Sequence, residues 1–256
     1  MLWHVEGTNL HLMGSIHVLE QTRHGLFPEA EHIYQQAQRV AFESDLVTPP
    51  DPVLIENTAG QPLSAQVPAA VFANAARVWA DLGLDLTRLE HLIPWIAAMV
   101  IGCRGAAKRG IDIAHGVDKA LWDRVEQDGK ARITLESQAD LFTIIRTMPA
   151  DETASFLDYV TNPSITFQND IDVLIKAWHD HDDGAMKRIR DHRLSMWPVG
   201  FEKLITNRNQ AWMPNIVQLA ADRISTLVVV GALHCVGENG IPRLLEGRGL
   251  RLSRIV

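Results

Sequence analysis

The hydrophobic pattern places strand-like segments at both ends of the chain and helical segments between them. Residues 2–6 and 9–14 carry β-compatible side chains and predict a hairpin. Residues 224–230 form a β-branched run typical of a buried strand. Between residues 137 and 222 the apolar positions recur mainly at helical spacing.

Shorter elements complete this outline. We expect helices at 29–38, 71–82, 89–103, 117–127 and from 242 to 246, and strands at 39–43, 131–135 and 250–256. Residues 111–113 form a brief apolar segment, and residues 47–68 a proline-rich loop or short irregular insert. Strands from both chain ends must meet in one sheet. The pattern therefore predicts an α/β fold with a central mixed sheet, in a single domain over residues 1–256 with a helical cap or layer at roughly 70–222.

Composition narrows the class of protein. The chain has 256 residues, 46% of them hydrophobic, and a net charge of −7, which argues against intrinsic disorder and against a nucleic-acid surface. Cys103 and Cys235 are expected to be free thiols. No stretch reaches the roughly 20 apolar residues that cross a bilayer. The first residues lack a signal-peptide pattern, which favours the cytoplasm, with export still open if a leader has been removed.

One short motif occurs twice. Gly14-Ser15-Ile16-His17 and Gly231-Ala232-Leu233-His234 both place glycine at a predicted strand end and histidine three residues later. Open α/β sheets bind ligands beyond the carboxyl ends of their strands. The two histidines converge there if their strands are neighbours. In the alternative interpretation they are polar residues that close two separate strands.

Glu43 ends a third apolar strand, RVAFE. A carboxylate seldom sits there unless it is paired or serves as a ligand. Together with His17 and His234 it would make a hydrolytic metal set with an open position for water. The alternative is an ion pair with an arginine such as Arg208.

Several motifs resemble those of the TraB/GumN family, and they occur in the same order along the chain. The animal relatives of this family are the Tiki metalloproteases. The resemblance extends over nearly the whole chain, although the acidic residues that follow Ala177-Trp178 precede Gly184 rather than follow a glycine. The matching segments are Leu2–Gly7, Leu12–Leu19, Phe42–Asp45, Gly116–Asp118, Leu135–Ser137, Ala177-Trp178, Arg208-Asn209 with Trp212, and Val230–Gly237.

The resemblance implies an α/β fold similar to erythromycin-esterase-like and haem-binding ChaN-like proteins. Tiki members are metal-dependent peptidases that use both Gly-x-x-His motifs and the acidic residue. By position this implies that His17, Glu43 and His234 bind one divalent cation, with manganese, cobalt and zinc all admissible. It further implies that Arg208 and Asn209 complete a pocket for a peptide or small-molecule substrate.

Five residues receive more specific expectations. Arg208 could hold a substrate carboxylate or an oxyanion, and Asn209 could orient a carbonyl. Asp118 or Glu136 could be a fourth ligand, a general base or a partner of a histidine. The alternatives are a helix N-cap for Asp118 and a first-turn acid for Glu136. His115 either borders the pocket or lies on the surface.

The resulting prediction is a metal-dependent hydrolase, most simply a peptidase. A metal-free hydrolase would use His17 as the base, with Glu43 orienting it. A non-catalytic module would capture a peptide, as in pheromone shutdown, or haem in the same cleft. An interaction protein with a vestigial site predicts that His17, Glu43 and His234 lie far apart.

Two further groups have simpler interpretations. His179–Asp183 resembles a metal cluster, but we expect a solvated turn between helices. Trp178, Trp197 and Trp212 are expected to pack in the core, the alternative being a groove for an apolar peptide or lipid.

Overall fold

A mixed six-stranded sheet forms the centre of the computed structural model, which describes residues 1–23, 25–45, 48–57, 60–165 and 167–256. Its strand order is β6-β4-β7-β2-β1-β8, so both chain ends contribute, as predicted. The first four strands in this order run parallel, and β1 runs antiparallel to both of its neighbours. The strands are β1 (Leu2–Val5), β2 (Leu10–Ser15), β4 (Arg39–Phe42), β6 (Ala131–Thr134), β7 (Thr226–Gly231) and β8 (Leu252–Arg254), and a separate ribbon pairs β3 (Leu19–Glu20) with β5 (Ile111–Asp112).

Strand β7 lies in the middle of the sheet, between β4 and β2. All six of its residues are buried, as expected for a β-branched strand that is covered on both faces. It pairs in parallel with β2, from Leu10 opposite Thr226 to Ser15 opposite Gly231. The predicted neighbourhood of the two Gly-x-x-His strands is therefore confirmed.

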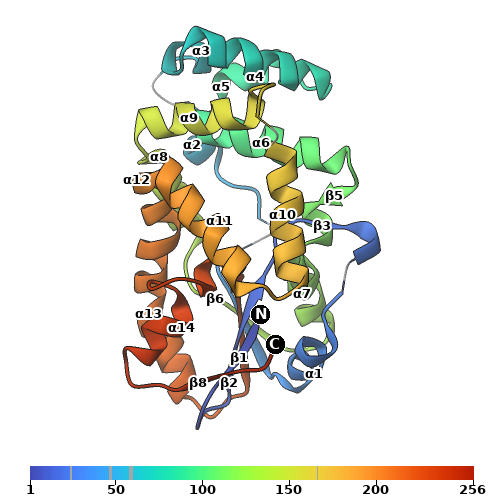
Figure 1. Cartoon of the computed structure of the whole chain (residues 1–256), viewed down its shortest axis with the longest axis vertical. Coiled ribbons are helices and arrows are strands. Elements are labelled where there is room, and N and C mark those ends of the chain that lie inside the picture. The colour runs from blue at the N-terminus through green and yellow to red at the C-terminus, as the bar shows by residue number, and fades with distance from the viewer. Residues whose placement is uncertain (24, 46–47, 58–59, 166) are drawn as a thin grey trace.

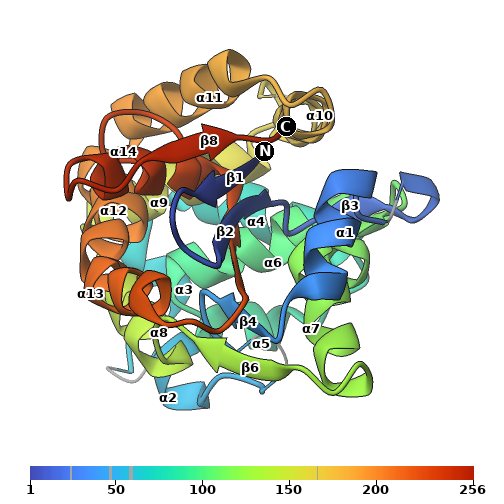
Figure 2. The ribbon, with the colours of Figure 1, turned by 90° about the horizontal axis from the view of Figure 1, so that it is seen from below.

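Helices flank the sheet and extend beyond one end of it. Helices α13 and α14 lie on one side of the sheet and α1 and α7 on the other (Figures 1 and 2). The helices are α1 (Pro28–Gln36), α2 (Pro52–Ile55), α3 (Leu63–Gln66), α4 (Ala69–Asp81), α5 (Leu86–His91), α6 (Pro94–Ala107), α7 (Val117–Gln127), α8 (Gln138–Arg146), α9 (Ala150–Thr161), α10 (Phe167–His179), α11 (Asp183–Met196), α12 (Pro198–Phe201), α13 (Arg208–Ala221) and α14 (Ile241–Glu246).

Two segments differ from the sequence prediction by more than a small shift of their ends. The described part of the 47–68 segment contains the short helices α2 and α3, while positions 46–47 and 58–59 lie outside the described residues. The expected helix 89–103 is divided, because Pro94 favours the first turn of a new helix, α6. The turn expected at His179–Asp183 is present, and the Asp182 side chain ends it by accepting a hydrogen bond from the Ala185 N–H, which caps α11.

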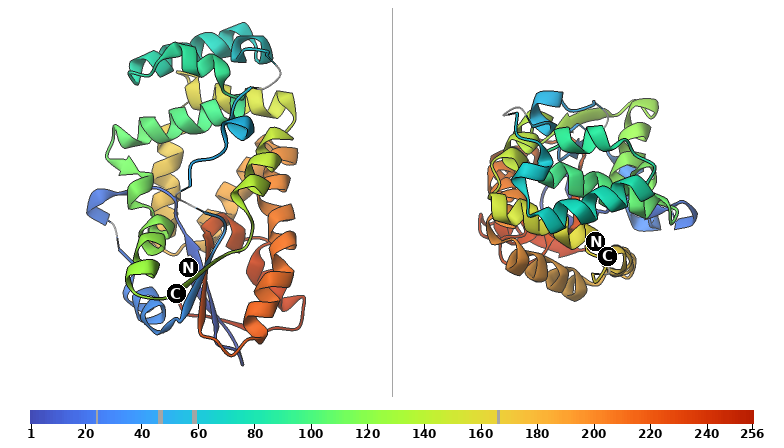
Figure 3. Two further views of the ribbon diagram at one scale, coloured as in Figure 1. Left: turned by 180° about the vertical axis from the view of Figure 1, so that it is seen from behind. Right: turned by 90° about the horizontal axis from the view of Figure 1, so that it is seen from above.

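The described residues form two apolar cores. One surrounds the sheet and includes Trp122, Trp178 and Trp212, and the other lies among the helices around Trp79 and Trp95. Helices α3, α4, α5, α6 and α9 gather beyond one end of the sheet and cover it (Figures 1 and 3). Within the described residues, no helix is both long and apolar enough to span a membrane.

Candidate functional site

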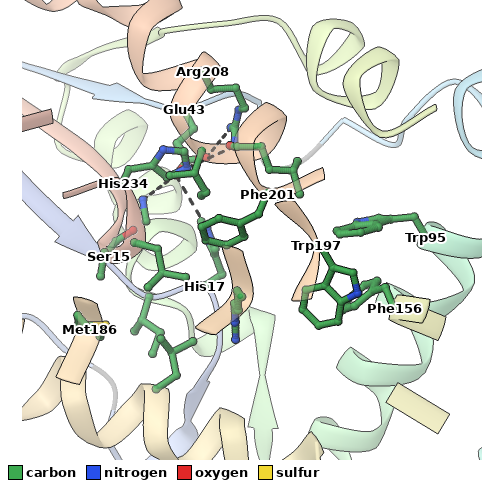
Figure 4. Close-up of a pocket in the computed structure, with 18 of the residues that line it drawn as sticks. Ser15, His17, Glu43, Trp95, Phe156, Met186, Trp197, Phe201, Arg208 and His234 are labelled. Carbon is green, nitrogen blue, oxygen red and sulfur yellow. Dashed lines mark hydrogen bonds and ion pairs between the residues drawn. The ribbon is translucent and has the colours of Figure 1, made fainter. Parts of the chain in front are cut away.

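His17, Glu43 and His234 meet at the carboxyl edge of the parallel strands. They follow β2, β4 and β7, and this end of the sheet faces the helical cap. The Nε2 atoms of His17 and His234 lie 3.9 Å and 3.7 Å from Oε1 of Glu43. Figure 4 shows the three side chains grouped on one side of a pocket. An interaction protein with a vestigial site was expected to have these three residues far apart, and their convergence contradicts that expectation.

His17 is oriented by the start of α7. Its Nδ1 atom is hydrogen-bonded to Oδ2 of Asp118, and the Val117 N–H donates to the Ile16 carbonyl at 2.9 Å. Gly116 permits this close approach, since a Cβ there would lie 2.3 Å from the His17 carbonyl oxygen. Asp118 makes no capping hydrogen bond, and Gly116 holds the N-cap position. The N-cap alternative for Asp118 is therefore wrong, and its carboxylate contacts His17 instead, while its function in the site stays a prediction.

Asp118 also sets the charge of His17. Its carboxylate raises the pKa of His17 to about 9 against the opposing effect of burial, with Glu43 assisting. The His17 side chain is nevertheless 54% exposed. Solvent therefore screens the pair, and the pair contributes less to stability than a buried one.

His234 is held from the opposite side by Asn209. Its Nδ1 atom lies 2.6 Å from Oδ1 of Asn209, whose Nδ2 donates to the carbonyls of His234 (3.1 Å) and Asn239 (2.7 Å). The amide oxygen must accept, so Nδ1 of His234 carries the proton and Nε2 keeps its lone pair. Burial lowers the pKa of His234 to about 3, despite Glu43. Asn209 is fully buried and positions His234, so it does not orient a substrate carbonyl as the sequence suggested.

Arg208 joins Glu43 to a second acid. Its Nη2 atom lies 2.7 Å from Glu43 and 2.6 Å from Glu136, and its Nη1 atom lies 3.0 Å from the Leu204 carbonyl and 3.3 Å from Nε2 of His234. These contacts engage every nitrogen of a guanidinium that is only 5% exposed. Arg208 is therefore a structural cation of the site rather than a free oxyanion donor. The alternative interpretation of Glu43, an ion pair with Arg208, is confirmed.

The two acids bound to Arg208 differ in environment. Burial alone would raise the pKa of Glu43, but the His234, Arg208 and His17 side chains and the Gly231 N–H at 2.6 Å hold it well below its usual range. Burial raises the pKa of Glu136, which also accepts a hydrogen bond from Nε1 of Trp212. Glu136 precedes the Ser137 N-cap of α8, so it is not the first-turn acid of the alternative.

A π-helical turn at Glu202–Asn207 leads into α13. It sets the direction in which Arg208 and Asn209 leave the helix, toward Glu43 and His234 respectively. π-Helical turns recur at functional sites. Two residues adjacent in sequence thereby hold different parts of the site: Arg208 contacts Glu43, and Asn209 contacts His234.

Gly231 leaves the space between the donor atoms open. A Cβ at this position would lie 3.0 Å from Nε2 of His17 and 3.2 Å from Oε1 of Glu43. Such contacts are tight, so even alanine would crowd both groups. The glycine of the second motif thus avoids tight contacts with two members of the site.

The donor set fits a divalent metal ion in several respects. Both imidazoles direct an Nε2 atom toward Glu43, and both Nδ1 atoms have the outer partners that metal-bound histidines usually have. Ligand bonds of about 2.0–2.2 Å at tetrahedral angles separate ligand atoms by roughly 3.3–3.6 Å. The observed 3.7 Å and 3.9 Å are slightly longer. Glu43 and the two histidines are therefore suitable ligands after a small contraction.

Arg208 opposes such an ion. Its Nη1 atom approaches the Nε2 lone pair of His234, and its charge already neutralises Glu43. Across the described part of the chain, no group of three His, Cys, Asp or Glu side chains is already in place to hold a metal. Binding would therefore require Arg208 to release His234.

His115 and the His179–Asp183 segment lie away from this centre. His115 lines a different cavity, with Leu26 and Leu121. The acidic segment is the turn between α10 and α11, as expected, with the side chain of His179 60% exposed. Neither contributes a ligand to the His17–Glu43–His234 centre.

An apolar cavity of about 290 Å³ opens from the centre into the helical layer. Its far wall is aromatic, with ring centroids 4.2 Å apart for Trp95 and Phe156 and 5.1 Å apart for Phe156 and Trp197. Figure 4 shows these rings facing the histidine side across the pocket. Trp178 and Trp212 pack in the sheet core as predicted, whereas Trp197 lines the cavity.

Sequence reasoning missed two features of this pocket. The first is the hydrogen bond between Asn209 and His234. The Arg208-Asn209 motif marks Asn209 as a site residue, but the motif does not indicate which group the amide binds. The aromatic wall comes from α6, α9 and the turn before α12, and these segments have no local pattern that brings them together. Only tertiary packing reveals it.

Asp118→Asn is expected to lower the pKa of His17 from about 9 toward its ordinary value of 6.5. Because the raised pKa belongs to the folded state, stability from the pair is present below pH 6.5 and lost as pH rises through about 9. We would follow the imidazole nitrogens by NMR in chelator-treated protein, with the signals of distant histidines as internal reference. An unchanged midpoint in the variant would show that Asp118 does not control His17.

Comparison with known proteins gives a family match over nearly the whole chain. The model of the TraB/PrgY/gumN family matches residues 1–254. The uncharacterized protein YbaP of Escherichia coli (strain K12) is 24% identical over 246 residues, which cover 93% of this chain and 88% of that protein. The uncharacterized protein YbaP of Shigella flexneri is 24% identical over 244 residues, covering 92% and 87%. No solved structure matches.

Proposed function

Because this chain belongs to the TraB/PrgY/gumN family, we propose that it acts as its Gly-x-x-His motifs suggest, as a hydrolase of peptide or ester bonds. One observation carries the proposal. The Nε2 atoms of His17 and His234, one from each motif, both point toward Oε1 of Glu43. In this proposal His17, Glu43 and His234 hold one divalent cation, with manganese, cobalt or zinc as candidates.

In this proposal the cation and the surrounding residues would have different roles in hydrolysis. When bound, a divalent cation lowers the pKa of a water molecule and polarises a carbonyl. Asp118 and Asn209 would hold the Nδ1 side of His17 and of His234, and Nε2 of His17 would have to give up its proton when the cation binds. Arg208 fixes the orientation of Glu43, and the aromatic cavity excludes bulk water from the scissile bond. Water adds across that bond, giving a carboxylic acid and an amine or alcohol.

A metal-free hydrolase is the second candidate, and the contact of Arg208 with both Glu43 and His234 favours it. His17 would then take the proton from water. With a pKa of about 9, His17 is mostly protonated at neutral pH, so activity should rise through pH 9. An alkaline rate profile that chelators leave unchanged would support this candidate.

Metal content tests the proposed cation. Protein purified without a histidine tag and soaked with manganese, cobalt or zinc is expected to retain about one ion per chain after dialysis. The Glu43→Ala/His234→Ala variant and His17→Ala should lose it, because each loses ligand atoms. His179→Ala is the matched control for adventitious binding, since its side chain is exposed at the end of α10.

Two results would contradict the proposed cation site. In the first, all the variants retain as much metal as the parent. In the second, the parent holds no metal after soaking. In both cases a peptide-library assay still decides between hydrolysis without metal and capture without turnover. Release of new amino termini would support the metal-free enzyme, and intact bound peptide would support a binding module.

A further inference from the structure

An unpaired cation lies on the wall of the apolar cavity. Arg193, from α11, lines the same cavity as His17, Glu43 and His234. Across the described residues its side chain has no hydrogen-bond or ion-pair partner. Burial lowers the pKa of its guanidinium, and Asp170 on α10 raises it without forming an ion pair. The other charged arginine on the wall, Arg208, is fully engaged by Glu43 and Glu136.

The local sequence places Arg193 there. Arg190 and Trp197, the residue after α11, lie three and four residues from Arg193, and Met186 lies seven residues before it, so all three share its helix face, and all three are buried. Lys187 and Arg188, on the other face, have side chains 52% and 75% exposed. A charge on the inner face costs free energy unless something neutralises it, and a bound ligand can do so.

Other polar atoms on the cavity wall also lack partners. Oγ of Ser15 and Nε1 of Trp197 are buried without a hydrogen bond within the described part of the chain. Ser15 immediately precedes the Ile16-His17 end of its motif, and Trp197 belongs to the aromatic wall.

We propose that Arg193 binds the terminal carboxylate of a short apolar peptide whose side chains occupy the aromatic part of the cavity. Guanidinium recognises carboxylate by two parallel hydrogen bonds. Ligand pockets usually measure roughly 300–1,000 Å³, so a cavity of about 290 Å³ lies at the small end of that range and favours a short ligand. This inference rests on the proposed hydrolase and narrows its substrate to peptides cleaved near a free carboxyl end.

Binding of matched ligands tests the proposal independently of hydrolysis. The probes are N-acetyl-Phe-Phe and its C-terminal amide, titrated into chelated protein by calorimetry, with chromatography to confirm that both stay intact. The parent is expected to bind the acid at least tenfold more tightly than the amide, about 1.4 kcal/mol. Arg193→Met should bring the two dissociation constants within about twofold, while the amide affinity changes less than about threefold.

Two further variants control for folding and for charge at a distance. Arg193→Lys keeps a point charge but not the paired donors, so part of the acid preference should remain. Arg188→Met removes an exposed arginine from the same helix and should leave the preference unchanged. Circular dichroism and urea unfolding verify each fold.

The outcomes separate this inference from the proposed function. Equal binding of acid and amide by the parent, or an acid preference that survives Arg193→Met, would overturn it. Tighter binding of decanoate than of the peptide acid would also overturn it, in favour of an acyl-chain ligand. A retained acid preference without turnover would instead reject the hydrolase while supporting carboxylate binding. If turnover occurs, Arg193→Met should raise KM for peptide acids and leave kcat within about threefold.

Discussion

Replacing Arg208 by methionine is expected to lower the free energy of unfolding by about 3–5 kcal/mol, because it leaves buried carboxylates without their cation. Glu43 and Glu136 both contact Nη2 of Arg208, and their side chains are only 11% and 9% exposed. Methionine fills much of the same volume but provides no charge. Urea unfolding at pH 7 measures the loss.

The double variant Arg208→Met/Glu136→Gln should recover part of this stability, since one of the stranded charges is gone. Arg243→Met is the surface control: its partner is Glu246, its side chain is 64% exposed, and the expected loss is below about 1 kcal/mol. The destabilisation should also shrink as the pH falls, because Glu136 is then free to take up a proton. A loss below about 1 kcal/mol for Arg208→Met at pH 7 would mean that the guanidinium does not stabilise the site.

Glu43→Gln is expected to reduce kcat/KM at least a thousandfold in any peptidase assay that detects the parent, about 4 kcal/mol of transition-state stabilisation. The substitution keeps the shape of the side chain but removes the negative charge to which both histidines are directed. It also places an amide where the Gly231 N–H donates to Oε1 at 2.6 Å. Both the metal-dependent and the metal-free proposals require the charge.

Glu136→Gln is the matched comparison, because Glu136 also binds Arg208 but has no contact with His17 or His234. Its loss should stay within about tenfold, and Glu246→Gln, on the surface, should have no effect. Gly231→Ala tests the same centre by crowding His17 and Glu43 without changing charge. Similar losses for Glu43→Gln and Glu136→Gln would indicate that activity depends on Arg208 rather than on the histidine centre.

The sequence predicts the sheet well because each strand has its own hydrophobic signature. The β-branched run of β7 and the hairpin of β1 and β2 are local patterns, and they appear with small shifts in their ends. The position of the two Gly-x-x-His motifs at strand ends then places their histidines at one edge. Parallel pairing of β2 and β7 is what makes them neighbours.

The contacts between side chains are less predictable. The sequence offered both an N-cap and a histidine partner for Asp118, and nothing in Gly116-Val117-Asp118 decides between them. The choice depends on the bond between the Val117 N–H and the Ile16 carbonyl, which ties α7 to the end of β2. The Arg-Asn motif suggests that Asn209 orients a substrate carbonyl. The motif does not reveal that this side chain is completely buried. Short-range patterns define elements, whereas roles depend on how the elements pack.

The pairing of β2 with β7 has a consequence for how the protein folds. Leu10 lies opposite Thr226, so nearly all of the chain must be ordered or looped out before the centre of the sheet closes. Such non-local contacts slow folding, because the entropy of loop closure is lost before the contact forms. The two halves of the candidate site belong to these late contacts. During refolding, helical signal should therefore return before peptide binding, and a nascent chain that ends before Thr226 lacks the strand that separates β4 from β2.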